Sequence, residues 1–120
     1  MVSQTTLREL ALSLPDVTEE PHFEKTSFRV RKKIFATMDD KSTRATVKLT
    51  EMDQDLFSSI DRTVICPVPN KWGKQGWTHV ELSKIQDELL AEVLLAAYCT
   101  VAPRKLAESV RPDHGNSLKE

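Results

Sequence analysis

The sequence predicts an α+β fold, a two-layer sandwich with helices packed on one face of a five-stranded antiparallel sheet. Segments with apolar residues at helical spacing lie near both ends of the chain, and segments in which apolar and polar residues alternate lie between them. The connections between these alternating segments are short, so neighbouring strands must pair antiparallel. The predicted order of elements is α-β-β-β-α-β-β-α.

Composition and charge limit the class of protein. The chain has 120 residues, and its 17 basic and 18 acidic side chains give a net charge of −1, which excludes a histone-like polycation. No stretch approaches the roughly 18 consecutive apolar residues of a membrane helix, and the first residues do not resemble a signal peptide. We therefore expect a cytoplasmic protein without membrane contact, with one domain over residues 1–109 and a flexible tail over 110–120.

The first element is a helix whose apolar residues recur at positions i, i+3, i+4 and i+7, namely Leu7, Leu10, Ala11 and Leu14. Two residues are candidates for the N-cap of this helix: Thr6, which has capping-box spacing with Glu9, and Ser3 as the alternative. Pro15 ends the helix. The following residues, 15–23, are acidic and contain two prolines, which indicates a loop.

Three strands follow, over residues 27–31, 34–38 and 44–49, because apolar and polar residues alternate in each. Tight turns over 31–33 and 39–42 connect them. The alternation places one set of residues beneath the helices, namely Phe28, Val30, Ala45 and Val47. The opposite set faces solvent, namely Arg29, Arg31, Arg44, Thr46 and Lys48. In the middle strand, Ile34, Ala36 and Met38 are expected to share one face.

The second half of the chain adds two strands and two helices. Thr50 is the expected cap of a short helix that ends near Ser59. Strands are predicted over 63–67 and 77–82, separated by a loop over 70–76. Ser83 and Gln86 have capping-box spacing before a long helix, and Pro103 restarts a short helical piece. The long helix is expected to pack through Leu90, Val93, Leu94, Ala97 and Val101.

Basic charge is concentrated in residues 23–48, where eight basic and three acidic residues give a net charge of +5. The loop over 70–76 adds a tryptophan flanked by lysines, a pattern that can stack on a base while its cations meet phosphate. The candidate nucleic-acid-binding residues are Arg29, Arg31, Lys32, Lys33, Arg44, Lys48, Lys71, Trp72 and Lys74. The alternatives are an ordinary solvated sheet face and tryptophans that fold back onto the core.

Other chemistry has little support in the sequence. The three histidines are far apart, and neither a metal-binding cluster nor a nucleophile motif such as GxSxG is present. Cys66 and Cys99 lie in apolar runs, which is typical of reduced thiols in or near a core. We expect no metal, no cofactor and no enzymatic activity.

Several motifs together resemble the MmcQ/YjbR family of small bacterial proteins. They are PHFEKTSFRV over residues 21–30, KIFA over 33–36, WGKQGWT over 72–78, and Ala97-Tyr98 followed by APRKL over 102–106. The resemblance implies a two-layer sandwich with a five-stranded antiparallel sheet, similar to the CyaY-like and secretion-chaperone-like folds. Family members are often described as DNA-binding because of a winged arrangement of hairpins.

These observations predict a monomeric, non-enzymatic accessory protein that binds DNA weakly, without sequence preference and in a salt-dependent manner. The alternative is an adaptor that binds a protein or a small ligand in a groove near the Trp72 loop. The family-motif or groove candidates are His22, Phe23, Lys25, Trp77, Tyr98 and Lys105, together with Trp72 itself.

Overall fold

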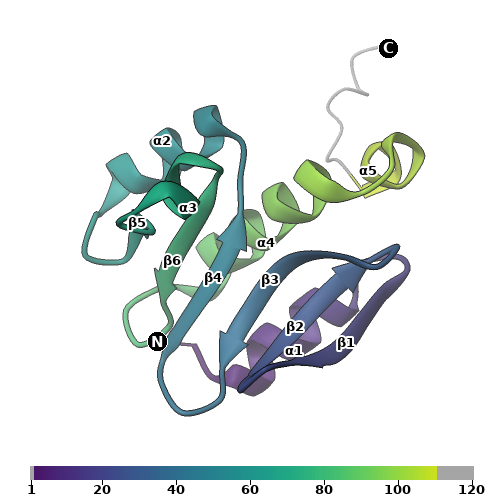
Figure 1. The fold of residues 1–120 in the computed structure, drawn as a ribbon, viewed down its shortest axis with the longest axis horizontal. Coiled ribbons are helices and arrows are strands. Elements are labelled where there is room, and N and C mark those ends of the chain that lie inside the picture. The colour runs from purple at the N-terminus through teal and green to yellow at the C-terminus, as the bar shows by residue number, and fades with distance from the viewer. Residues whose placement is uncertain (1, 111–120) are drawn as a thin grey trace.

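The fold was analysed in a computed structural model that describes residues 2–110 (Figure 1). The helices are α1 (Gln4–Leu12), α2 (Glu51–Ile60), α3 (Lys71–Lys74), α4 (Asp87–Val101) and α5 (Arg104–Val110). The strands are β1 (Val17–His22), β2 (Lys25–Val30), β3 (Lys33–Asp39), β4 (Arg44–Lys48), β5 (Ile65–Pro67) and β6 (Trp77–Glu81). The predicted tail lies outside the described residues, apart from Val110, which ends α5.

The strands form one antiparallel sheet in the order β1-β2-β3-β4-β6-β5. The α+β class and the antiparallel pairing are confirmed, but the sheet has six strands where five were predicted. The additional strand is β1, which lies within the predicted loop over residues 15–23. This edge strand carries exposed glutamates and Pro21, which are typical of protected sheet edges but weaken a strand signal in sequence.

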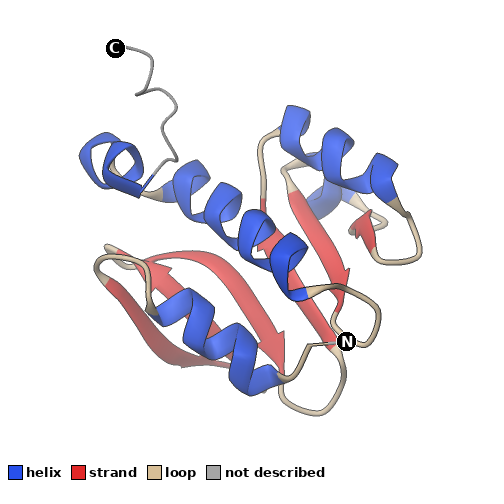
Figure 2. Cartoon of the chain, turned by 180° about the vertical axis from the view of Figure 1, so that it is seen from behind, coloured by secondary structure: helices blue, strands red, loops and turns tan. Residues whose placement is uncertain are grey.

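Helices α1 and α4 cover one face of the sheet (Figure 2). The alternation predicted for β2 and β4 is confirmed, since Phe28, Val30, Ala45 and Val47 are at most 1% exposed and point into this layer. Most of the predicted helical layer is buried, namely Leu7, Leu90, Val93, Leu94 and Ala97. Leu10 and Leu14 are only partly buried, and they pack at the margin of the core.

A β-bulge interrupts the pairing of β2 with β3. Phe28 pairs with Ala36, but Arg29 pairs with Ile34, so Phe35 has no partner across the ladder. Phe35 and Ala36 are both fully buried. The prediction that Ile34 shares a face with Ala36 and Met38 is therefore wrong, because one extra residue in a strand reverses the alternation.

The cap predicted at Thr50 is confirmed, and at α1 the alternative Ser3 is confirmed while the capping box at Thr6 is wrong, because Thr6 lies inside the helix. Ser3 caps α1 by accepting a hydrogen bond from the backbone N–H of Thr6 at 3.1 Å, and Thr50 caps α2 through the N–H of Asp53 at 3.1 Å. The capping box at Ser83 is wrong: Gln86 occupies the N-cap of α4, and the Ser83 hydroxyl donates to Glu81 instead. Among residues 2–110, no helix combines the length and the apolar character needed to cross a membrane.

Candidate ligand groove on the open sheet face

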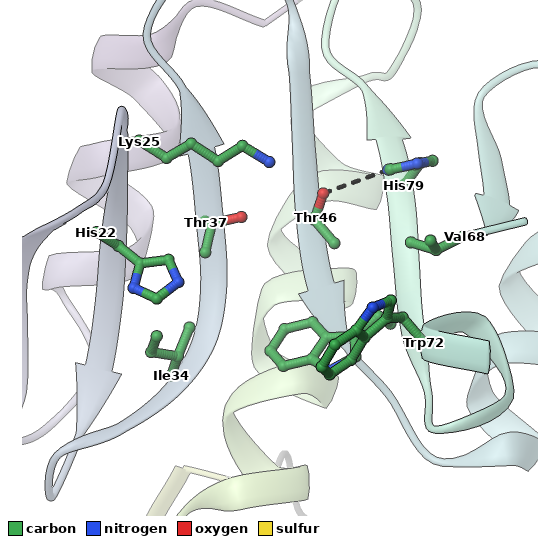
Figure 3. Close-up of a pocket in the computed structure, with 9 residues that line it drawn as sticks. His22, Lys25, Ile34, Thr37, Thr46, Val68, Trp72 and His79 are labelled. Atoms are coloured by element: carbon green, nitrogen blue, oxygen red, sulfur yellow. Dashed lines mark hydrogen bonds between the residues drawn. The ribbon is translucent and has the colours of Figure 1, made fainter. Parts of the chain in front are cut away.

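The sheet face opposite α1 and α4 carries a groove of about 340 Å³ (Figure 3). This volume is within the range of small-molecule sites, at its lower end. Five strands, α3 and the segment before α3 contribute to the lining, which consists of His22, Lys25, Ile34, Thr37, Thr46, Val68, Trp72, Trp77 and His79. Both tryptophans of the chain therefore line one groove, although different elements carry them.

Trp72 reaches the groove because residues 70–76, predicted as a loop, contain the short helix α3. Asn70 caps this turn by accepting a hydrogen bond from the Trp72 N–H at 2.8 Å. Gly73 packs so closely that a Cβ there would lie 1.9 Å from the carbonyl oxygen of Val68. The Trp72 ring is consequently held over the sheet while remaining half exposed.

Gln54 of α2 connects the helix that carries Trp72 to the strand that carries Trp77. Its buried amide nitrogen lies 2.9 Å from the carbonyl oxygen of Gly73, 3.0 Å from Thr78 Oγ1 and 3.3 Å from the carbonyl oxygen of Trp77. A buried amide with three acceptors around its two protons holds these elements in one arrangement. No local pattern in the sequence marks Gln54, because its acceptors lie 19 to 24 residues away along the chain.

Hydroxyl groups form the floor of the groove. Pairing aligns the lining residues Thr37, Thr46 and His79 in a row across β3, β4 and β6. The Thr46 hydroxyl lies 3.3 Å from His79 Nδ1. Burial lowers the pKa of His79, and the positive charges of Arg44 and Lys25 lower it further, so the ring is neutral at neutral pH.

Lysines border the aromatic part of the groove. Lys48 Nζ lies 5.2 Å from the centre of the Trp77 ring, and Lys71 Nζ lies 6.0 Å from that of Trp72. From the other side, Lys25 extends across the sheet toward Thr37 (Figure 3). The groove thus combines flat apolar surfaces with cations at its margins, which suits a planar ligand that carries negative charge.

The remaining predicted nucleic-acid-binding residues are not part of the groove lining. The β2–β3 turn with Lys32 and Lys33 lies across the sheet from α3 (Figure 1), directly before Ile34 of the groove lining. Arg31 forms an ion pair with Asp16 at 2.9 Å, and Arg29 lies 3.9 Å from a Glu20 carboxylate oxygen. These carboxylates reduce the charge that the two arginines offer to a phosphate.

Arg44 and Lys74 are exposed, but they do not join the other basic residues in a continuous stripe. Arg44 begins β4 and pairs with Glu81 of β6. The hydroxyls of Ser83 and Thr43 keep the pKa of Glu81 below its ordinary value, so Glu81 is charged. It lies directly across the ladder from Arg44 and offsets its positive charge. Lys74 is the last residue of α3, two positions after Trp72 along the chain. The open face has scattered basic residues beside an apolar groove.

Three of the predicted groove candidates lie elsewhere. Tyr98 is fully buried on α4, where its hydroxyl donates to the Pro15 carbonyl at 2.8 Å and its ring meets Phe35 edge-on. Lys105 is exposed on α5. Phe23 is 94% exposed at the tip of the β1–β2 turn with a φ of 59°, and it borders an acidic hollow outside the groove.

Within the described residues, no three His, Cys, Asp or Glu side chains are close enough to hold a metal ion. Cys66 and Cys99 are both free and half buried, and Cys66 lies in β5 next to His79 across the ladder. Cys99 packs against the core as predicted, whereas Cys66 shares the open face of the sheet with His79.

The fold is that of a two-layer α+β protein with helices on one face of its sheet and a groove on the other. The chain belongs to the YjbR family, which it matches over residues 12–100. Among solved structures it is similar to protein DR2400 of Deinococcus radiodurans, which carries the DUF419 domain. The TM-score is 0.74 at 24% identity, over 84% of this chain and 79% of that chain, a likeness that shows the fold. No curated protein matches the sequence.

Proposed function

We propose that the protein is a non-enzymatic binding protein whose groove takes a nucleotide-like ligand, a planar ring linked to an anionic group. One observation carries this proposal: Trp72 and Trp77 line the same groove, and each ring has a lysine over it. Planar rings stack on such side chains, and the cations provide contacts for a phosphate. The ligand is either a free nucleotide or an unpaired base of a single strand.

Binding without catalysis fits the polar groups in the groove. The Thr46 hydroxyl and the neutral His79 ring are 3.3 Å apart, which resembles a nucleophile beside a base. In residues 2–110, however, no carboxylate is hydrogen-bonded to the other nitrogen of the ring to orient it. These groups can instead donate and accept hydrogen bonds at the edge of a bound ring.

Intrinsic fluorescence gives a direct test, because the only two tryptophans of the chain lie in the groove. We expect adenosine monophosphate to quench this fluorescence, with weaker effects from adenosine, which lacks the phosphate, and from ribose 5-phosphate, which lacks the ring. Trp72→Ala should weaken binding by about ten-fold or more. Lys25→Gln should weaken the nucleotide more than the nucleoside, whereas Lys105→Gln, far from the groove, should change neither.

A thymidine oligonucleotide of about ten residues distinguishes the two sources of the ligand. Tighter binding of this single strand than of any mononucleotide indicates a nucleic acid, and equal or weaker binding indicates a free nucleotide. If none of these probes changes the fluorescence at millimolar concentration, or if Trp72→Ala binds as the wild type does, the groove proposal is wrong.

Duplex DNA is the second candidate, supported by the exposed Lys32 and Lys33 of the β2–β3 turn. Weak contacts from about three to five cations predict a slope of log affinity against log salt of about −3 to −5. Changing Arg31, Lys32 and Lys33 together to Glu should abolish duplex binding and leave nucleotide binding in the groove intact. Duplex binding that survives this change would contradict a role for the turn.

A further inference from the structure

Helix α2 exposes an apolar stripe on the side away from the core. Met52 is 79% exposed, Leu56 is 59% exposed and Ile60 is 58% exposed. These residues are four positions apart, so they follow one another along a single face of the helix. Among the described residues, none covers this stripe, and it lies on a different element from the groove.

The orientation of α2 is fixed by its other face. Phe57 is buried in the core, and the Gln54 amide is hydrogen-bonded to α3 and β6. The helix cannot rotate to bury Leu56 without exposing Phe57 and leaving the acceptors of Gln54 unpaired. The stripe is therefore a stable surface feature, and contiguous exposed apolar surface is typical of interaction sites.

Carboxylates flank the stripe on both sides. Asp53 lies on one side, Glu51 and Asp55 lie on the other, and α2 contains no basic residue. Asp61 follows the helix, and hydrogen bonds from Thr63 keep its pKa below the ordinary value, so it is charged as well. Lys84 borders Ile60, and the exposed Arg62 follows Asp61, so the carboxylates dominate beside Met52 and Leu56. A complementary partner must present an apolar ridge with cations beside this part of the stripe.

We propose that α2 is a docking site for a basic amphipathic helix of another protein. A second copy of this chain is a poor occupant, because its own α2 would place Asp55 and Glu51 against the same acidic residues. An anionic membrane surface is repelled for the same reason. A helix with leucines at i, i+3, i+4 and i+7 and lysines on either side satisfies both the apolar and the charged parts of the surface.

The test uses the whole protein and a synthetic peptide of about 18 residues, or five helical turns, with a leucine face bordered by lysines. Nuclear magnetic resonance titration should show shifts centred on α2. Leu56→Ser should weaken binding by about ten-fold or more, whereas Leu12→Ser, at another exposed leucine, should not. Trp72→Ala should also leave peptide binding unchanged, which separates this surface from the groove.

Two further peptides complete the test. A scrambled peptide of the same composition, without a continuous leucine face, and a peptide with glutamate in place of lysine should both bind weakly. Equal binding of the scrambled peptide, shifts centred on the groove, or no effect of Leu56→Ser would each overturn the proposal. It is also overturned if sedimentation shows a dimer that Leu56→Ser dissociates, or if anionic vesicles bind α2, because the occupant is then a second copy or a membrane.

Discussion

Gln54 provides the sharpest test of how the groove is held together. Its amide has two protons for three acceptors, the carbonyl oxygens of Gly73 and Trp77 and the Thr78 hydroxyl. Thr78 already donates its own proton to the Gly76 carbonyl at 3.0 Å, so it accepts from Gln54. Two hydrogen bonds contribute about 1 to 3 kcal/mol, and unpaired buried acceptors add a further cost. Gln54→Leu, which preserves most of the volume, should therefore lower the free energy of unfolding by about 2 to 4 kcal/mol.

Gln54→Glu has nearly the same shape and should be worse than Leu at neutral pH, because it places a carboxylate against three oxygens. Those oxygens raise the folded-state pKa of the new carboxyl above its unfolded value of about 4.3. The variant should therefore gain stability relative to the wild type as pH falls through the folded-state pKa toward the unfolded one. Urea denaturation at several pH values measures this, with Gln75→Leu at an exposed site as the control. A Glu variant as stable as the wild type at pH 7 would refute the hydrogen-bonding scheme.

Three further predictions concern the core, a turn and a titrating group. Leu94→Ala should lower the free energy of unfolding by about 2 to 5 kcal/mol, since Leu94 is 1% exposed. A loss below about half a kcal/mol in urea denaturation would contradict its place in the core. Leu12→Ala, at an exposed leucine, is the control. Lys32→Gly should stabilise the protein by about 1 kcal/mol in the same assay, because Lys32 has a φ of 73°, whereas Lys33→Gly in β3 should destabilise it. Burial is the main cause that lowers the pKa of His79 from its ordinary 6.5. The neutral ring therefore favours the folded state above pH 6.5, and this contribution to stability is lost as the pH falls through the lower folded-state pKa. His79→Gln should flatten that part of the stability profile, and an unchanged profile would show that His79 is not responsible.

Local patterns were sufficient to predict the faces of the central strands. The alternation around Arg29 and Thr46 assigns each residue to a face because side chains change sides at every position. The same reasoning failed at Ile34, since the bulge at Phe35 arises from pairing between strands. It also failed for β1, whose exposed, proline-containing sequence becomes a strand by pairing with β2.

The groove was predicted only in part. His22, Lys25, Trp72 and Trp77 do line it, but the groove was expected against the last helix, and α4 covers the opposite face of the sheet. Tyr98 was misplaced although a signal was available: it follows Leu94 by four positions on α4 and therefore belongs to the buried side of the helix. For Ile34, Thr37 and Val68, only the three-dimensional structure brings the residues together.

The bulge at Phe35 connects the fold to the groove. An extra residue bends a strand and increases its twist, and it also changes which side chains face outward. Here it keeps Phe35 and Ala36 together in the core and turns Ile34 to the open face, across the groove from Trp72 (Figure 3). Regular alternation would have placed Ile34 with Ala36 beneath the helices and left the groove without an apolar wall on β3. The irregularity that defeated the sequence prediction is thus the feature that gives the groove its apolar wall on β3.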